Sequence, residues 1–249
     1  MTIARIALAA LALVACRLAA AANEDCPQPF RITYAVEWRG LSAGTSVLEL
    51  TRRGPGEYTY QSSNTARGLF RLALPDTITQ KSQFSMKDGR VVPSTYVADD
   101  GSSDTRRDVS LTFDWDAGRV TGTAEQRPVD QPIEPGVQDA LSVQIALMCA
   151  LARGESPESF QLIDKDEVKE YQYTREGEEV LETPVGHLKT VIYKSQKTGS
   201  SRATRLWIAP DVGYLPVRAE QTRRGKREFL LQIRALERAG SGPAPTAHR

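Results

Sequence analysis

The chain has 249 residues, of which 40% are hydrophobic and 25% charged, and its formal net charge is +1. This composition is typical of a globular protein, and the length is ample for a sizeable core. A charge so close to neutral argues against a nucleic-acid-binding protein.

The N-terminal segment predicts export. Residues 1–5 are a short basic region, and residues 6–15 form an apolar run that is too short to span a bilayer. Residues 1–22 are therefore expected to be a signal peptide.

Two endings of this signal stay open. Leu13-Val14-Ala15-Cys16 resembles a bacterial lipobox, in which Cys16 would be acylated and would tether the protein to the outer membrane. Residues 20–22, three alanines, offer an ordinary cleavage site that would release the protein into the periplasm. Release is the preferred alternative, and membrane contact is expected only through such a lipid anchor.

Export bears on the remaining cysteines, Cys26 and Cys149. An even pair in a compartment where disulfides persist favours a bond between them. The alternative is a small buried Cys149 and an unpaired Cys26 near the terminus.

From residue 30 onward, short segments rich in Val, Thr, Tyr and Phe alternate with turns that contain Gly, Asp or Pro. This pattern is typical of an antiparallel meander. The strands predicted in the first half cover residues 30–38, 46–51, 57–63, 76–86, 90–98, 107–115 and 119–124.

One segment breaks this pattern. After the proline-rich stretch 127–135, residues 137–153 lack Gly and Pro, are apolar on nearly every side, and end before Gly154. The sequence therefore predicts one helix that is buried on most sides and fills the concave face of a curved sheet.

The second half returns to strands, and the last residues of the chain differ in composition from the strands and from the helix. Residues 239–249 are rich in Pro, Ala and Ser and are expected to be a disordered tail. The fold class expected for residues 27–238 is a single mainly β domain, a large antiparallel meander rolled into a half-open barrel or spiral around the helix, which hides the sheet edges. The strands predicted here cover residues 159–163, 168–175, 178–183, 189–195, 202–208, 215–221 and 229–236.

Three stretches together resemble an exported bacterial family known as domain of unknown function 3108. The most specific is Leu206-Trp207-Ile208-Ala209-Pro210-Asp211 followed by Gly213-Tyr214-Leu215-Pro216-Val217-Arg218. A similar arrangement of Trp and Leu-Pro occurs in Lol-type lipoprotein carriers, looser relatives whose half-open barrels hold acyl chains. The family has no established activity, so the resemblance implies a location and a fold. The other two stretches are Tyr34-x-Val36-x-Trp38-x-Gly40 with Ala43-Gly44, and Pro93-x-x-Tyr96.

Catalytic chemistry has little support in the sequence. The chain has two histidines, His187 and His248, and lacks the common nucleophile-elbow, zinc-protease and phosphate-loop patterns. The acidic residues 99–104 lack the spacing of a calcium loop, and a hydrolase using Asp114 and Asp116 ranks last. We therefore expect no enzyme, no catalytic residue, no metal and no cofactor.

Two noncatalytic hypotheses remain, both for a monomer. The preferred one is an envelope scaffold that binds an envelope protein partner. The alternative is a carrier or sensor of a lipid-like ligand between sheet and helix, which requires an apolar void of several hundred Å³ beside the helix. The candidate ligand-binding residues are Leu141, Ile145, Met148 and Trp207, although a core anchor is the preferred interpretation of Trp207.

Overall fold

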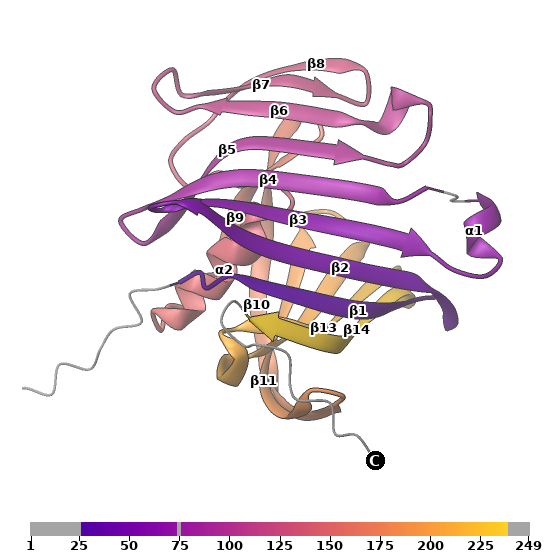
Figure 1. The fold of residues 1–249 in the computed structure, drawn as a ribbon. Helices are drawn as coiled ribbons and strands as arrows, with labels where there is room; N and C mark the ends of the chain where they lie inside the picture. Colours follow the sequence, from indigo (N-terminus) through magenta and orange to yellow (C-terminus); the bar gives the residue numbers. More distant parts are fainter. Residues whose placement is uncertain (1–25, 74–75, 239–249) are drawn as a thin grey trace, which may run out of the picture.

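The computed structural model describes residues 26–73 and 76–238, which form one antiparallel sheet of fourteen strands with two α-helices (Figure 1). The predicted signal peptide, Cys16 and the predicted tail 239–249 lie outside the described residues.

Eight strands come before the longer helix. They alternate buried and exposed side chains, as in β1, where Phe30, Ile32 and Tyr34 face the interior. The elements are β1 Phe30–Trp38, β2 Leu41–Gly54, β3 Glu57–Ala66, α1 Phe70–Ala73, β4 Ile78–Lys87, β5 Arg90–Asp99, a 3₁₀ turn Thr105–Arg107, β6 Val109–Asp114, β7 Arg119–Ala124 and β8 Arg127–Pro132.

Six strands follow the longer helix, and they include the longest hairpin of the described chain, β10–β11. The elements are α2 Ser142–Ala152, β9 Ser159–Asp164, β10 Glu167–Thr183, β11 Gly186–Lys197, β12 Arg202–Ala209, a 3₁₀ turn Pro210–Val212, β13 Leu215–Arg223 and β14 Lys226–Arg238.

The order of strands explains the shape. Each strand pairs with its sequence neighbours, except that β14 returns to pair with β1 and that β8 and β9 are the two edges. The edges approach each other through ion pairs, Arg127 to Asp166 at 3.0 Å and Lys165 to Glu125 at 2.9 Å, without forming a ladder. The expectation of a half-open antiparallel barrel with one buried helix is confirmed.

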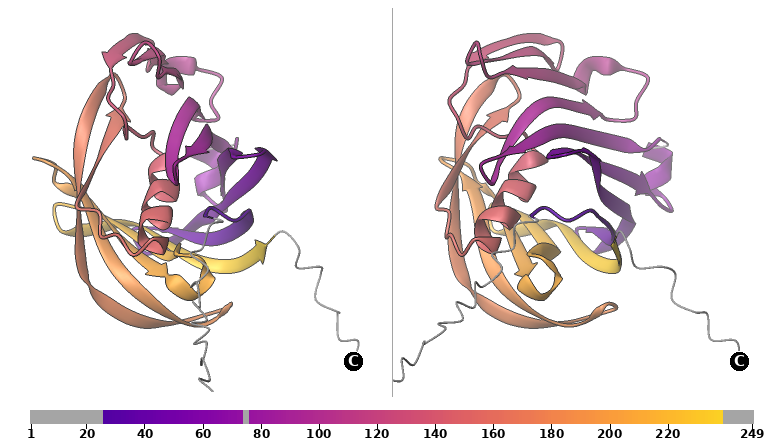
Figure 2. Two further views of the ribbon diagram at one scale, coloured as in Figure 1. Left: turned by 90° about the vertical axis from the view of Figure 1, so that its left-hand side faces the viewer. Right: turned by 60° about the vertical axis from the view of Figure 1, so that its left-hand side comes forward.

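Helix α2 lies inside the curved sheet, between its two halves (Figure 2). Val143, Leu147 and Leu151 pack against strands β9–β12, in one apolar cluster. Leu141 and Ile145 belong to a second, larger cluster that contains residues of most strands of the first half and some of the second half. Because the helix contacts apolar side chains in both directions, it carries no polar face.

Three details of the sequence prediction were wrong: the start of the helix, the absence of strand β8 and the division of β10 into two strands. The helix begins at Ser142 rather than at residue 137, because Gln138 pairs as an extended residue with Leu162 of β9. Strand β8 was missed in the proline-rich stretch. Segments 168–175 and 178–183 are one strand, β10, with a bulge at Gly177 instead of a turn.

The register places the connections alternately at two ends of the barrel. The helix end contains Cys26, the β4–β5 hairpin and the C-terminus of α2. The open end contains α1 and the hairpins β1–β2, β7–β8, β9–β10, β11–β12 and β13–β14. Neither helix of the described chain is long and apolar enough to cross a bilayer.

Candidate functional site: a pocket at the open end

The predicted ligand-binding residues of α2 lie in the core. Leu141, Ile145 and Met148 are 6%, 0% and 3% exposed, and all three belong to the larger apolar cluster. Met148 also borders a cavity of about 300 Å³ near Pro27 and the turn at Gly213. The structure thus brings these three side chains together as packing between the helix and the first half of the sheet.

Trp207 belongs to the same apolar cluster and also contacts charged side chains. Its indole Nε1 donates a hydrogen bond to Glu179 Oε2 at 2.6 Å, and the Arg218 guanidinium lies 4.4 Å from the ring centroid. Since Arg218 pairs with Trp207 across β12 and β13, both side chains lie on the same face of the sheet. Trp207 is therefore held by neighbours that leave it 5% exposed.

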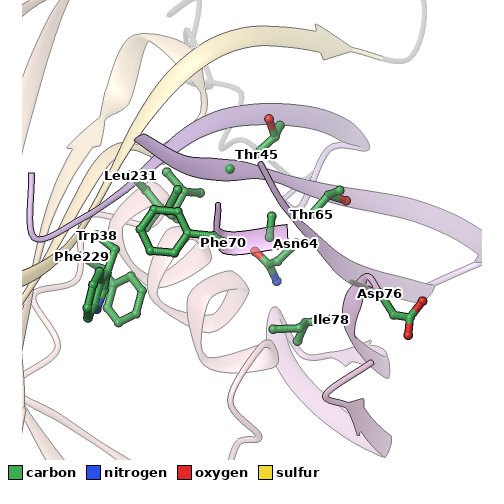
Figure 3. A pocket seen from close by; sticks show the side chains of 13 residues that line it. Trp38, Thr45, Asn64, Thr65, Phe70, Asp76, Ile78, Phe229 and Leu231 are labelled. Carbon is green, nitrogen blue, oxygen red and sulfur yellow. The ribbon is translucent and has the colours of Figure 1, made fainter. Parts of the chain in front are cut away.

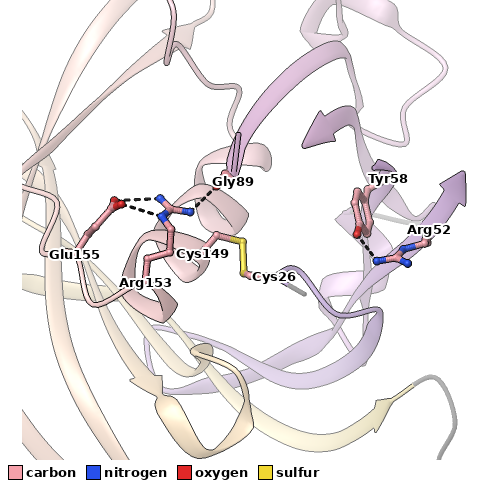
Figure 4. Close-up of a disulfide and its surroundings, with 7 residues drawn as sticks. All are labelled: Cys26, Arg52, Tyr58, Gly89, Cys149, Arg153 and Glu155. Atoms are coloured by element: carbon pink, nitrogen blue, oxygen red, sulfur yellow. Dashed lines mark hydrogen bonds and ion pairs between the residues drawn. A yellow bond between two sulfur atoms is a disulfide. The ribbon is translucent and has the colours of Figure 1, made fainter. Parts of the chain in front are cut away.

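The Cys26–Cys149 disulfide is present and fastens the N-terminal end of the described chain to α2 (Figure 4). Arg153, at the end of the helix, donates to the carbonyl of Gly89 in the β4–β5 hairpin and forms an ion pair with Glu155 at 2.8 Å. The helix is thus tied at its C-terminal end to two separate parts of the first half.

The N-terminal end of α2 is held by a buried carboxyl group. Asp139 Oδ1 accepts hydrogen bonds from the backbone amides of Leu141 and Ser142, both at 2.8 Å, and Oδ2 accepts one from the Ser82 hydroxyl at 2.6 Å. Burial raises the pKa of Asp139, although these hydrogen bonds oppose the shift. The helix is therefore fixed to β4 as well.

The open end contains a pocket of about 420 Å³ (Figure 3). Apolar side chains from β1, β14 and α1 form most of its wall, while Thr45, Asn64 and Asp76 add a few polar atoms. This volume lies within the range of small-molecule sites. The full lining is Val36, Trp38, Ala43, Gly44, Thr45, Asn64, Thr65, Ala66, Phe70, Asp76, Ile78, Phe229 and Leu231.

Aromatic rings shape one side of this pocket. Phe70 of α1 meets the Trp38 indole edge-on, with ring centroids 5.7 Å apart, and the Arg39 guanidinium lies 4.7 Å from the same indole. The surroundings of the pocket expose further apolar side chains, with Leu41 60%, and Leu69 and Leu72 both 84% exposed. Exposed apolar surface of this kind marks interaction sites on globular proteins.

The pocket exists because small residues of β2 and β3, Ala43, Gly44 and Ala66, leave space on the inner face opposite the aromatic side chains. In β1 and β2, Phe30 pairs with Leu50, whereas Val36 pairs with Gly44 nearer the open end. A Cβ atom at Gly44 would lie 2.2 Å from the carbonyl oxygen of Thr65, so the close approach of β3 requires glycine here. The space that large side chains fill at the helix end is consequently empty at the open end.

Sequence reasoning missed this pocket, although the signal was present. Four of its lining residues, Val36, Trp38, Ala43 and Gly44, belong to the first stretch of the family motif. The motif therefore supplies part of the pocket wall in addition to marking the family resemblance.

The other motif residues are joined by tertiary contacts. The buried Tyr34 hydroxyl donates to the carbonyl of Pro216 at 2.6 Å, and the Trp115 indole donates to the carbonyl of Pro93 at the same distance. These hydrogen bonds connect β1 to β13 and the β6–β7 turn to β5, so the residues serve the fold.

A second cavity, of about 640 Å³, adjoins the polar hairpins of β9–β13 at the same end. Its wall is polar and charged, and Tyr171 has a pKa raised to about 12 by burial and by the neighbouring Asp164. The lining is Asp164, Lys165, Asp166, Glu167, Lys169, Tyr171, Ser195, Gln196, Lys197, Ser200, Ser201, Arg202, Thr204, Gln221 and Arg223.

Carboxylate groups gather at one place on the described part of the chain. In residues 26–73 and 76–238, one group of three side chains, Asp99, Asp100 and Asp108, brings carboxylate oxygens within 4.8 Å of one another. Asp100 already accepts hydrogen bonds from the amide and hydroxyl of Ser102. Asp100 is thus held by its own turn, and a cluster of acidic side chains alone carries no functional assignment.

A family model described as "Protein of unknown function (DUF3108)" matches residues 33–229. The chain belongs to this family. A search of curated proteins finds no significant match.

Several solved structures are similar in fold to this DUF3108 protein, at low sequence identity. A β-barrel-like protein of the domain of unknown function DUF1849 from Brucella abortus is 12% identical, with a TM-score of 0.55 over 85% of this chain and 98% of that one. MucB, at 15% identity and a TM-score of 0.39, aligns with 90% of this chain and 57% of its own length. In the structure of the Pseudomonas aeruginosa MucA/MucB complex, the matched chain is 14% identical, with a TM-score of 0.40 over 88% of this chain and 54% of that one.

Proposed function

We propose that this DUF3108 protein is a noncatalytic binding protein of the cell envelope that holds an apolar ligand in the open-end pocket. The observation that carries the proposal is the contrast within one concave face. Leu141 and Ile145 are buried in core packing, and the cavity of about 300 Å³ beside Met148 has a mixed polar and apolar wall, whereas the pocket of about 420 Å³ beside Trp38 and Phe70 has a mostly apolar wall. A ligand would therefore enter at the end opposite the helix.

Export supports the envelope location. The Cys26–Cys149 bond is of the kind that persists outside the cytoplasm, and it agrees with the signal peptide expected at residues 1–22. The mature protein would then be a periplasmic monomer, released by cleavage after residue 22 or anchored to the outer membrane through Cys16.

The direct test measures binding of N-phenyl-1-naphthylamine, a neutral apolar dye whose fluorescence rises in apolar surroundings. The mature protein should bind it saturably, and Ala66→Phe should weaken binding at least tenfold by filling the pocket. Ala117→Phe adds the same ring to the exposed β6–β7 turn and should leave binding unchanged. Equal binding by both variants would contradict the proposal.

Native mass spectrometry of protein purified from its host adds an independent test. A lipid-sized adduct on the folded protein would support ligand binding. The same mass separates an acylated Cys16 terminus from one near Asn23, which decides between the two forms of the mature chain.

The scaffold is a second candidate because Leu69 and Leu72 are almost fully exposed beside the pocket. Replacement of both by Ser should abolish crosslinks to an envelope protein partner while dye binding is retained. If crosslinks in intact cells persist in this variant, the scaffold surface is elsewhere or absent.

A further inference from the structure

The polar cavity beside the apolar pocket indicates the class of ligand. The two cavities are neighbours on one face, because Phe229 of β14 lines the apolar pocket and pairs across the sheet with Gln221 of β13, which lines the polar cavity. Arg223 lies two residues beyond Gln221 on the same strand and also lines the polar cavity. Strand geometry places the Cα atoms of Gln221 and Arg223 about 7 Å apart along β13.

The charges of the polar cavity leave an excess of positive charge near Phe229. Each acidic side chain in its lining already has a cationic partner: Asp164 has Lys197 at 2.7 Å, Asp166 has Arg127 at 3.0 Å, and Glu167 has Lys169. The cavity therefore offers no unpaired carboxylate that would repel an anion.

The arginines differ from these paired groups. Within the described residues, no carboxylate lies within 4.0 Å of the Arg223 guanidinium, and the nearest ion-pair contact of Arg202 is Glu228 at 3.8 Å. Arg202 and Arg223 pair directly across β12 and β13, so their side chains lie next to each other on the concave face. Two adjacent guanidinium groups form a site for a carboxylate or phosphate group.

We propose that the ligand is an anionic single-chain amphiphile, whose tail occupies the apolar pocket and whose acidic head group is bound by Arg202 and Arg223. The apolar pocket, at about 420 Å³, has room for one tail rather than several. This inference rests on the proposed function, since it names the ligand class of the same pocket.

The test compares two fluorescent probes that differ only in charge, cis-parinaric acid and its methyl ester, on the mature protein. The acid should bind about tenfold more tightly than the ester, and the difference should shrink at high ionic strength. The double variant Arg202→Gln with Arg223→Gln should lose this preference and keep the affinity for the ester. Arg224→Gln removes the neighbouring turn arginine, which is outside the cavity lining, and should change neither.

The outcomes separate the two claims. The anionic head group is refuted if the unmodified protein binds acid and ester equally, or if the double variant keeps the preference for the acid. Either result leaves the proposal of an apolar ligand in the pocket unaffected. Failure of both probes and of the neutral dye overturns the proposed function itself. Unchanged thermal unfolding of each variant shows that loss of binding is not loss of fold.

Displacement of cis-parinaric acid then identifies the head group. Oleate presents a carboxylate, and a single-chain lysophosphatidylglycerol presents a phosphate. The ligand that displaces the probe at the lower concentration shows which of the two head groups the arginines prefer. Tighter displacement by a two-chain phosphatidylglycerol than by both would overturn the single-chain assignment.

Discussion

The two ends of the barrel are built from the same strands but are packed differently. At the helix end, α2 fills the interior, and a disulfide, Arg153 and Asp139 fasten it to the first half of the sheet. At the open end, small residues such as Ala43 and Gly44 leave a pocket, and Leu69, just before the short helix α1, and Leu72 within it are exposed. One curved sheet therefore supports a packed core at one end and a candidate binding site at the other. The effects of mutation should divide in the same way.

The largest effect is expected from loss of the disulfide. Cys26→Ser with Cys149→Ser frees a loop of 123 residues in the unfolded chain, which should lower the free energy of unfolding by on the order of 4–5 kcal/mol. Urea denaturation measures this change, and unmodified protein under reductant should behave like the variant. A loss below about 1 kcal/mol would mean that the disulfide does not restrict the entropy of the unfolded chain as this estimate assumes.

Core packing at the helix end should give the next largest effect. Ile145→Ala removes a fully buried side chain, 0% exposed, and should cost about 2–5 kcal/mol. Leu72→Ala at the open end, where the side chain is 84% exposed, should stay within about 0.5 kcal/mol. Similar losses in both variants, measured by chemical denaturation, would refute the division between the two ends.

The buried carboxyl group should make stability depend on pH. Because the pKa of Asp139 is raised in the folded protein, the folded chain retains this proton to a higher pH than the unfolded chain. Its contribution to the free energy of unfolding therefore falls as pH rises from about 3.9, the ordinary Asp value, to the raised pKa.

Asp139→Asn isolates this contribution. The amide oxygen retains an acceptor for the helix amides but does not titrate, so the stability of the variant relative to the unmodified protein should increase with pH across that window. Denaturation curves at several pH values measure the difference, with Asp116→Asn, an exposed carboxylate in the β6–β7 turn, as the control. A difference that is constant with pH would show that Asp139 titrates alike in both states.

The smallest effect is expected at the seam between the edge strands. Arg127→Gln breaks the 3.0 Å ion pair with Asp166, whose side chains are 56% and 31% exposed, and should cost less than about 1 kcal/mol. Thermal unfolding at low and high salt checks this expectation, since salt should remove most of the difference. A larger loss would mean that the seam, and not only α2, holds the two halves together.

Much of the fold was predictable because the signals are local. Alternation of apolar and polar residues located nearly all strands, and an unbroken apolar stretch located α2. Strand β8 escaped notice because Pro128 and Pro132 argue against a central strand, but β8 is an edge of the sheet, where proline is tolerated. Glu176-Gly177 looked like a turn because a bulge and a turn use the same residues.

The binding site was less predictable. Residues of α2 were nominated because an apolar helix that packs permanently and one that contacts a ligand have the same sequence. Only the tertiary structure showed that Leu141 and Ile145 are packed, whereas Trp38, Phe70 and Phe229 surround a pocket. These three side chains come from β1, α1 and β14, which are distant in the sequence.

Most of the strands, the single buried helix and the pair of cysteines were predictable, because each depends on residue type and short-range spacing. Only the tertiary structure decided which end of the barrel is filled, where the apolar pocket lies and that two arginines stand beside it. The physical reason is that a cavity is the volume left over by side chains from several strands, so its position depends on register and curvature that no local stretch of sequence specifies.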